Sequence, residues 1–519
     1  MVKYLDNNNG FNQWANAHAK SKSSKSIGFW GWLALFFLSW WIVGTFFQSK
    51  KVQNEVVQPV AIEISNLNSE KIDSDKISFD VTGLRISNVA LKEHKKSATT
   101  DDFVTLLNDK NNFVEIGFVS SDTQMPNINT KWENKSDKRV WKNKDKIDFS
   151  RNIAVADYLI TVSDTIKNNS NSEITVTPYA HIVSGAQSTQ TSVVETGGVV
   201  YANSNLDYEN WNKLNKKSYA YSTVRGSLGF AEQYWETIVA LDANDQTISL
   251  RKNGDSYFAD TMAAPIKIAP KSEKTINTYI FAGPRIAKVL DFASDNIPGI
   301  SKTMDYGWFW FFAQPMLWMI NWLYEFVGNY GVAIILMTLI LRILMWPLTR
   351  KSYVSTMAMQ KMQPELQRVQ KLYANDKARQ QVEMMRVYQT YKTSPMSGCL
   401  PMLLQIPIFF ALYKALLISV PMRSAHFLWI SDLAVMDPYF ILPILMGATM
   451  WLQQFLQSGV KSKSDNKNDP MAATQKMMKW LPVLFTFMFA WMPAGLVLYW
   501  TVSNIFGIVQ MYIIKKTVK

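Results

Sequence analysis

The sequence predicts a polytopic α-helical membrane protein with six spans and a large extracytoplasmic antiparallel β-sandwich domain. Three observations lead to this fold class. The 519 residues are 48% hydrophobic and include 19 Trp and 25 Met, which is rich for a soluble chain. Strongly apolar residues are confined to 27–47 and most of 307–514, whereas 48–300 has the composition of a water-soluble domain. Basic residues gather in alternate segments between the apolar stretches.

The first apolar stretch, residues 27–47, predicts an uncleaved membrane anchor that follows a polar N-terminal extension at 1–26. Its 21 residues can cross about 30 Å of hydrocarbon as a helix. A cleaved signal peptide is the alternative. It would have a shorter apolar core and a small-x-small cleavage site, which residues 43–47 do not supply.

Five further spans are predicted, and the last four fill residues 400–514. The stretch 307–326 is also long and apolar enough to cross, so hydropathy alone leaves a seventh span open. We interpret it, within 301–329, as an amphipathic helix lying along the membrane interface, because its Trp and Phe residues suit that environment. The five predicted spans are 330–346, 400–420, 439–456, 479–492 and 495–514.

The distribution of Lys and Arg predicts that both chain termini are cytoplasmic. With six spans, the segments 1–26, 347–400, 456–479 and 515–519 are cytoplasmic and carry net charges of +3, +6, +3 and +3. The whole chain carries +13, so its basic excess is cytoplasmic. A seventh span at 307–326 would move the later basic segments outside, which argues against it. These charges fit contact with anionic lipid or the ribosome better than DNA binding.

Residues 48–300 are predicted to form the β-sandwich outside the cytoplasm. Short stretches such as 77–81 and 174–176 alternate apolar and polar residues with the period of two that is typical of half-buried strands. Turns rich in Asn, Ser and Lys separate these stretches. One helical stretch is expected at 228–238.

A carbohydrate site is the most specific function that a β-sandwich suggests. His94, His181 and the scattered acidic residues show no constellation in the sequence. We therefore favour a scaffold or partner-docking role for the domain.

Residues 347–399 predict a cytoplasmic helical hairpin. Pro364 suits a helix start, and residues 374–376 offer the turn. Flexible Met side chains could bind varied apolar partners, or the Met face could pack on itself, and the sequence does not distinguish the two. The apolar positions at helical spacing are Met362, Leu366, Val369, Tyr373, Val382, Met385 and Tyr388.

Arg342 is the only ionisable residue between Tyr330 and Trp346, the ends of a predicted span. Such a charge costs about 2.5 to 3.5 kcal/mol at a helix centre. It lies four residues from the end of the span, so it either acts within the membrane or extends to the lipid headgroups. Polar residues of other spans could line a hydrated cavity with it, although each alone is explained by helix–helix contact. These are Gln405, Lys414, Gln453, Gln454, Thr501, Ser503 and Asn504.

Several kinds of chemistry are not expected. The single cysteine, Cys399, cannot form an internal disulfide, and no Cys/His cluster has metal-ligand spacing. No phosphate-binding loop, dinucleotide fingerprint or nucleophile elbow is present. The sequence therefore predicts no cofactor, no metal and no catalytic residue, and the chain is not expected to be an enzyme.

From Gly307 to the C-terminus the chain resembles the YidC/Oxa/Alb family of membrane protein insertases, and closely its branch in Gram-negative bacteria. The sandwich resembles the periplasmic domain of that branch more weakly, through residues 256–258 and 281–284. Arg342 stands at the position of an arginine typical of the family. The other matching motifs are DYGW at 305–308, AQP at 313–315, WPLT at 346–349, MQP at 362–364, GCLP at 398–401, QIPIF at 405–409, DPY at 437–439, LPILMG at 442–447 and PAGLVLYW at 493–500.

The resemblance implies a five-helix core around a hydrophilic groove that opens to the cytoplasm and to lipid. An acidic extracytoplasmic segment of a substrate would be drawn toward Arg342, while its apolar segment slides along a greasy surface into lipid. The implied groove residues are Arg342, Gln405, Gln453, Gln454, Ser503 and Asn504, and the implied slide residues are Met450, Met488, Tyr499 and Trp500. Whether Lys414 faces the groove or the headgroups stays open.

The partners that the resemblance implies are nascent membrane proteins, the Sec translocon, membrane lipids, the ribosome and the signal recognition particle receptor. The tail at 515–519 is short, which weakens the argument for a ribosome-binding extension. The implied location is the bacterial inner membrane, with the sandwich in the periplasm.

Two other functions remain as alternatives. An intramembrane Arg can mark an ion path, but transporters usually have repeated halves with broken helices, and no internal repeat is found. A structural factor that assists membrane protein folding or scaffolds the Sec complex is the other alternative, and it is compatible with insertion.

Overall fold

The computed structural model describes residues 69–517 except 98–99, 108–111, 136–137, 186–193, 195, 392–399 and 458–469. The predicted N-terminal extension and first span, 1–47, lie outside the described residues, as do Cys399 and residues 518–519. The chain divides into two units. One contains residues 354–398, and the other contains residues 53–353 and 399–519.

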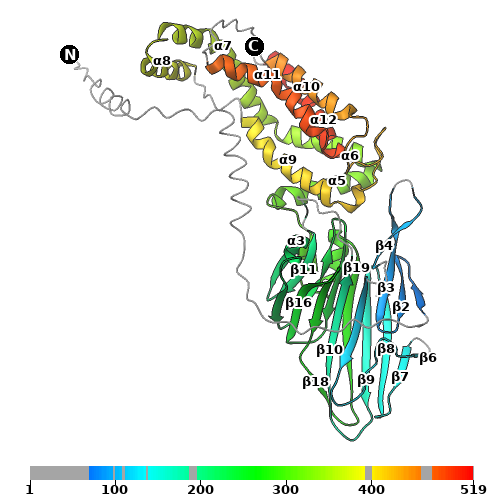
Figure 1. Ribbon diagram of the computed structural model, residues 1–519. Helices are drawn as coiled ribbons and strands as arrows, with labels where there is room; N and C mark the ends of the chain where they lie inside the picture. The colour runs from blue at the N-terminus through cyan, green and yellow to red at the C-terminus, as the bar shows by residue number, and fades with distance from the viewer. Residues whose placement is uncertain are drawn as a thin grey trace, which may run out of the picture. The chain divides into compact units, whose positions relative to one another are not determined.

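Two antiparallel sheets confirm the predicted β-sandwich (Figure 1). The first sheet has the order β1 (Glu70–Asp73), β2 (Ile77–Thr82), β3 (Arg85–Lys95), β5 (Phe113–Val119), β10 (Ile174–Ser184), β17 (Ser256–Met262), β16 (Gln246–Asn253) and β13 (Tyr219–Thr223), with β4 (Phe103–Leu106) beside β3 and β18 (Ile266–Ile268) beside β10. The second sheet has the order β12 (Asn205–Asn210), β11 (Gly197–Ala202), β14 (Ser227–Ala231), β15 (Trp235–Leu241), β19 (Glu273–Pro284), β9 (Leu159–Asn168), β8 (Ile147–Ala156), β7 (Lys138–Lys142) and β6 (Glu133–Lys135).

The alternation along strand β10 shows how the sequence builds the sandwich core. Ile174, Val176 and Ile182 are buried, whereas the intervening Thr175 and His181 are only half-buried on the opposite face. Since side chains point alternately to the two faces of a sheet, this period of two places the aliphatic residues between the sheets. The short helices α3 (Trp211–Leu214) and α4 (Ala287–Ala293) belong to this domain region.

The helix expected at 228–238 is wrong, because these residues belong to strands β14 and β15. Gly229 explains part of the difference. A Cβ at this position would lie 1.9 Å from the carbonyl oxygen of Thr237, so the glycine lets the two strands pair closely. The β-branched residues Ile238 and Val239 also favour a strand.

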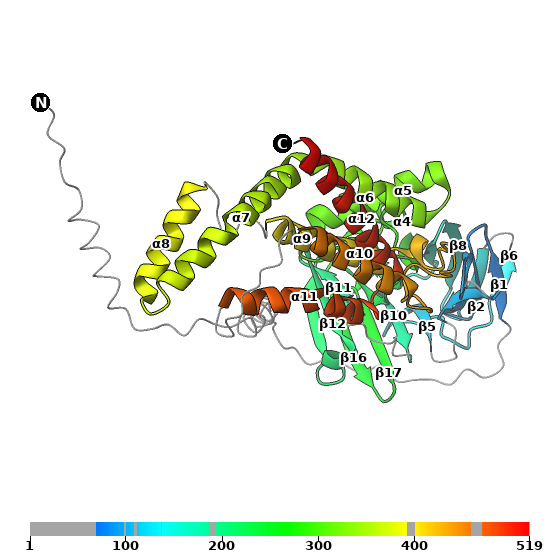
Figure 2. The ribbon, with the colours of Figure 1, turned by 90° about the horizontal axis from the view of Figure 1, so that it is seen from above.

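Eight helices of ten or more residues follow the sandwich in the described chain, and Figure 2 shows them from above. Four of them, α6, α9, α10 and α12, begin within two residues of the predicted start of a span, and α11 overlaps the fifth. They are α5 (Trp310–Val327), α6 (Tyr330–Leu344), α7 (Trp346–Leu372), α8 (Lys377–Thr390), α9 (Leu400–Ile418), α10 (Ile441–Gln457), α11 (Pro470–Phe489) and α12 (Ala494–Thr517).

Length and composition alone single out few of these helices as membrane-crossing. Within the described residues, α12 is long and apolar enough to cross by itself, and α6 and α7 qualify together although they are bent by 66°. Shorter apolar helical segments lie at 405–418, 441–456 and 480–489. The six-span arrangement therefore stays a prediction.

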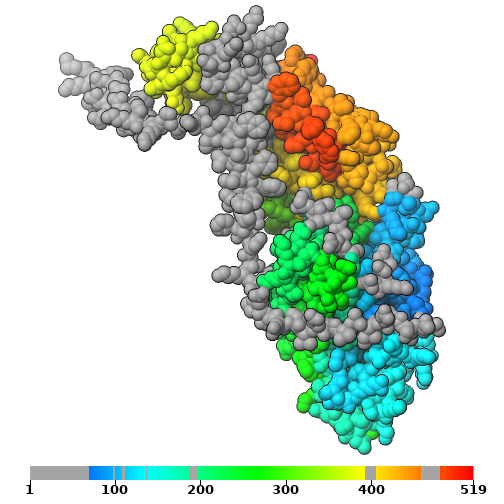
Figure 3. All heavy atoms as spheres, in the orientation of Figure 1, coloured from blue at the N-terminus to red at the C-terminus, as the bar shows by residue number. Residues whose placement is uncertain are grey.

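Helices α10 and α11 expose large apolar side chains. Figure 3 shows the two helices beside each other on one face. Trp480 and Phe487 of α11 are 70% and 68% exposed, and Phe455 of α10 is 60% exposed. Soluble proteins rarely display such contiguous apolar surface, so this face is suited to lipid.

Helix α5 is packed on one side only. Met316, Ile320 and Leu323 are buried, whereas Trp318 and Trp322 are exposed. The apolar residues on both sides, with Trp on the open side, suit the interfacial position predicted for 301–329.

The hairpin predicted at 347–399 appears as α7 and α8. Asp376 accepts a hydrogen bond from the backbone N–H of Arg379 at 3.0 Å and so caps α8 after the predicted turn. Pro364 does not start a helix, contrary to the prediction, because α7 begins at Trp346 and continues through it. Pro364 is exposed, so water can satisfy the carbonyl that loses its helical partner. Met362 and Leu366 are buried, whereas Val382 and Met385 are exposed.

Candidate functional site

Arg342 projects from the last turn of α6 toward α12. Its Nε donates a hydrogen bond to the hydroxyl of Ser503 at 2.8 Å, and its Nη2 donates to the same oxygen. The guanidinium is half-buried, and no other residue of α6 is charged. The side chain of Arg342 therefore contacts a neighbouring helix.

The positive charge of Arg342 has a neutral partner. Among the described residues, no carboxylate lies within ion-pair distance of its guanidinium, and the Ser503 hydroxyl carries no charge. Arginine stays protonated in proteins. Its charge is thus held in place by a hydrogen bond while its field remains available to an anionic group.

Helix α12 gathers further polar groups on the side of Ser503. Tyr499 lies one turn before Ser503, and its hydroxyl accepts a hydrogen bond from Gln405 Nε2 of α9 at 2.6 Å. Residues four apart share a helix face, so Tyr499 and Ser503 point the same way. The structure therefore brings Arg342, Ser503, Tyr499 and Gln405 together from three helices.

The other predicted groove residues connect helices. Asn504 Nδ2 donates to the carbonyl of Met446 at 3.4 Å and to the Thr449 hydroxyl at 3.3 Å, which joins α12 to α10. Gln453 Nε2 of α10 donates to the Tyr353 hydroxyl at 3.2 Å. Thr501 donates to a carbonyl of its own helix, and Gln454 is half-buried. Asn504 and Gln453 thus have the helix–helix role that was the simpler explanation.

Two polar residues near Arg342 were not found from the sequence. Gln510 Nε2 donates to the backbone carbonyl of Arg342 at 3.2 Å, and Tyr353 donates to the carbonyl of Gly507 at 3.2 Å. Gln510 follows Ser503 by seven residues, which returns it to the same helix face. That spacing could have identified it, whereas Tyr353 lies beyond the predicted span and had no such signal.

The four slide residues lie in different surroundings. Trp500 packs against Phe409, Phe485 and Phe489, with ring centroids 5.1 to 5.9 Å away. Met488 is 43% exposed, and Met450 is half-buried. Tyr499 is 3% exposed and belongs to the polar group around Arg342.

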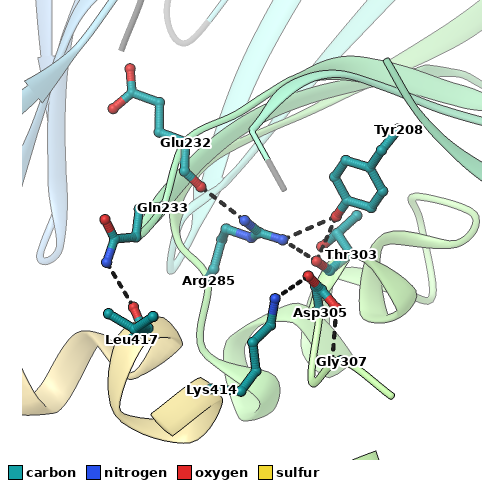
Figure 4. A network of polar contacts seen from close by, with 9 residues as sticks. All are labelled: Tyr208, Glu232, Gln233, Arg285, Thr303, Asp305, Gly307, Lys414 and Leu417. Carbon is teal, nitrogen blue, oxygen red and sulfur yellow. Dashed lines mark hydrogen bonds and ion pairs between the residues drawn. The ribbon is translucent and has the colours of Figure 1, made fainter. Parts of the chain in front are cut away.

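Lys414 of α9 forms an ion pair with Asp305, which precedes α5 (Figure 4). The other Asp305 oxygen, Oδ1, accepts a hydrogen bond from the N–H of Gly307 at 2.9 Å. Gly307 has a φ of 71° and lies beside the aliphatic part of Lys414. The charge of Lys414 is therefore neutralised by Asp305, and Arg342 remains without a carboxylate partner in the described chain.

The same region joins the sandwich to the helices. Arg285 donates to the carbonyls of Glu232 and Thr303 and to the Tyr208 hydroxyl, and Gln233 donates to the carbonyl of Leu417 at 2.9 Å (Figure 4). These bonds hold the segment before α5 between strands of the sandwich and α9.

Glu236 lies beneath this junction with unusual electrostatics. It is fully buried, accepts a hydrogen bond from the Thr303 hydroxyl at 2.9 Å, and lies 3.6 Å from Arg285 Nε. Burial raises its pKa from 4.5 to about 7, although Arg285 and Thr303 act in the opposite direction.

This shift predicts a pH dependence of sandwich stability. Because the folded-state pKa is raised, the contribution of Glu236 is most favourable below 4.5 and is lost as the pH rises to about 7. Glu236→Gln resembles the protonated acid and should make the free energy of unfolding less dependent on pH. Between low and high pH, this free energy should change by up to roughly 3 kcal/mol more in the parent than in the variant. Denaturant unfolding of the full chain and the variant at about pH 5 and about pH 8, followed by the circular dichroism of the sheets, measures it. Equal pH dependence in both proteins would contradict the assignment.

Comparison with known proteins covers nearly the whole chain. Residues 69–319 match the family model described as YidC periplasmic domain, and residues 322–519 match the model described as 60Kd inner membrane protein. A protein of Rickettsia prowazekii named membrane protein insertase YidC is 33% identical over 90% of this chain and 91% of its own length. A protein of the same name from Brucella suis is 32% identical over 85% of this chain and 78% of its own.

Some solved structures resemble a part of the chain. A galactose mutarotase related enzyme from Lactobacillus acidophilus covers 42% of this chain and 97% of its own, with 9% identity and a TM-score of 0.31. A likeness this distant says nothing about activity.

Proposed function

Because the chain belongs to the YidC family of membrane protein insertases, we propose that it inserts integral membrane proteins and helps them to fold, with Arg342 as the charge that receives the substrate. Members of this family are inner-membrane insertases and chaperones, and they are not enzymes. The periplasmic domain of the family corresponds to the sandwich.

The uncompensated charge of Arg342 is the observation that carries the mechanism. A guanidinium in an apolar membrane helix lowers stability, so its presence there indicates a function. In the described chain this guanidinium is bound only by neutral groups. An acidic segment of a substrate would supply the missing negative charge. The attraction to Arg342 would lower the free energy of this segment while it passes through the hydrocarbon region of the membrane.

The surrounding residues would give this charge a hydrophilic groove. We assign Gln405, Ser503 and Tyr499 to its wall beside Arg342, and Gln453, Gln454 and Asn504 to the contacts that keep its helices together. Met450, Met488 and Trp500 would contact the apolar segment of the substrate as it moves into lipid. No covalent bond is made or broken.

The proposed topology has six spans with both termini in the cytoplasm. The positive segments between the helices support this orientation. The hairpin of α7 and α8 would then meet substrates on the cytoplasmic side. Nascent membrane proteins are the proposed clients, and the Sec translocon, the ribosome, the signal recognition particle receptor and lipids are the proposed partners.

Reconstitution tests the proposed function directly. The purified full-length protein in liposomes should insert a small single-spanning substrate with an acidic translocated segment, as measured by protease protection. Empty liposomes serve as the control. Solute flux through the protein without insertion of the substrate would contradict the proposal and favour a channel.

A further inference from the structure

An open cavity of about 430 Å³ lies where the sandwich meets the start of α5, and we call it the junction cavity. Its lining comes from Tyr208 of β12, from residues 301, 302 and 304–307, and from Trp310, the first residue of α5. Figure 4 shows Tyr208, Asp305 and Gly307 of this lining. The volume falls within the roughly 300 to 1,000 Å³ that is typical of small-molecule sites, and none of the proposed groove residues lines the cavity.

Hydrogen bonds hold the polar wall of the junction cavity in place. The Tyr208 hydroxyl donates to the carbonyl of Thr303 at 2.6 Å. Asp305 Oδ1 accepts a hydrogen bond from the N–H of Gly307 at 2.9 Å, and Asp305 Oδ2 pairs with Lys414. The wall is therefore formed before a ligand arrives, which lowers the entropic cost of binding. Because Lys414 already neutralises Asp305, this carboxylate attracts a cationic ligand only weakly.

Lys302 gives the junction cavity a net positive charge. Its Nζ lies 3.5 Å from the carbonyl oxygen of Ser204 and 5.1 Å from the ring centre of Tyr201. In the part of the chain that the structure describes, no carboxylate lies within ion-pair distance of this ammonium group. Lys302 and Lys414 against Asp305 leave one positive charge. An exposed lysine is ordinary, but this one borders a cavity, so its field attracts an anionic group into a defined space.

Hydroxyl groups contribute to the same lining. Ser301 is exposed and Tyr306 is half-buried. Burial, with a smaller contribution from Asp291, raises the pKa of Tyr306, so its hydroxyl stays protonated and can donate a hydrogen bond. Phosphate oxygens accept hydrogen bonds from hydroxyl groups and charge-assisted hydrogen bonds from a lysine ammonium group. The polar part of the lining therefore suits a phosphate group.

The rest of the lining is apolar and continues onto α5. Met304 is 8% exposed, whereas Trp310 is 59% exposed. The neighbouring Trp308 and Phe311 are also exposed. Tryptophan rings concentrate at the boundary between lipid headgroups and hydrocarbon. A ligand of the junction cavity thus meets a positive charge and an exposed aromatic surface within one cavity.

We propose that the junction cavity binds the headgroup of an anionic phospholipid, with its phosphate at Lys302 and its glycerol backbone against Trp310. A phospholipid joins a phosphate to apolar chains, which matches both parts of the lining. An anionic headgroup is preferred over a zwitterionic one, because the lining carries a net positive charge and Asp305 is already neutralised. The proposal rests on the interfacial position of α5 and not on the mechanism proposed for Arg342.

Lipid titration of the full-length protein tests the proposal. The protein is held in an uncharged detergent, and native mass spectrometry counts the lipid that it retains as phosphatidylglycerol is added. Phosphatidylglycerol should bind at least about fivefold more tightly than phosphatidylcholine. Lys302→Gln should remove this preference, and Trp310→Ala should weaken the binding of both lipids. Soluble glycerol phosphate should bind more weakly than the lipid, because it lacks the chains that reach the aromatic surface.

Matched control variants identify the cavity as the place of binding. Lys288→Gln removes another exposed lysine, on α4, and Trp318→Ala removes another exposed tryptophan, on α5. Neither residue lines the junction cavity, so both variants should bind phosphatidylglycerol as the parent does. Lys302→Arg keeps the charge and should keep the preference for phosphatidylglycerol.

Four results would overturn the inference. They are equal binding of the two lipids by the parent, an unchanged preference in a folded Lys302→Gln variant, an equal loss of binding in the control variants, and binding of glycerol phosphate as tight as that of the lipid. The third would indicate diffuse adsorption, and the fourth a site for a soluble phosphate compound. If Trp310→Ala fails to fold, the comparison of Lys302→Gln with Lys288→Gln decides the question. Lipid binding is measured without insertion, so a failure here is distinct from a failure of the proposed insertase function.

Discussion

Replacing Arg342 with Ala should reduce insertion of substrates with acidic translocated segments by about tenfold or more, a loss of about 1.4 kcal/mol or more. The variant lacks a charge within α6 that no carboxylate of the described chain neutralises, so the substrate carboxylate gains no partner there. Arg342→Lys should lose less, because the charge survives while the two bonds to Ser503 cannot both be reproduced. Insertion into liposomes, followed by protease protection, gives the rates.

The control for this experiment is a second arginine and a second substrate. Arg350→Ala removes an exposed guanidinium from α7 and should leave insertion unchanged. A substrate whose translocated segment contains no acidic residue should be inserted equally by Arg342→Ala and the parent. If Arg342→Ala inserts every acidic substrate as well as the parent does, Arg342 does not act through its charge.

Breaking the pair between Lys414 and Asp305 should cost about 3 kcal/mol of the free energy of unfolding. The side chains are only 11% and 23% exposed, so either residue alone is left as a poorly solvated charge. Lys414→Met and Asp305→Asn should each show this loss in denaturant unfolding of the detergent-solubilised protein. The double variant should recover most of it, because no unpaired charge remains.

The double variant distinguishes an interaction from two separate defects. If the two single losses simply add, the pair does not stabilise the junction before α5. Lys267→Met is a useful control, since Lys267 pairs with Glu173 at a site where the two side chains are 72% and 49% exposed. That exposed pair should contribute less than about 1 kcal/mol.

Much of the fold could be predicted because its signals are local. The apolar stretch at 330–346 corresponds to α6 at Tyr330–Leu344, and the alternation at 77–81 corresponds to β2 at Ile77–Thr82. The length, hydrophobic period and composition of a segment can be read from that segment alone, without knowing which other helix or strand it packs against. Two expectations were wrong. At 228–238 the close pairing of two strands at Gly229 replaces the expected helix, and at Pro364 helix α7 continues through the exposed proline.

The candidate sites show where sequence reasoning stops. By itself the sequence determined the family and identified Arg342 as an unusual charge, because one ionisable residue stands out in an apolar helix. Only the tertiary structure showed that Ser503, which lies 161 residues away, accepts the hydrogen bond from the Arg342 guanidinium. It alone also showed that Lys414 pairs with Asp305. Likewise, His181 lies between Glu115 and Asp260 only because three strands pair in register. The physical reason is that contacts between distant segments depend on register and helix packing, and neither is encoded in the local pattern of any one segment.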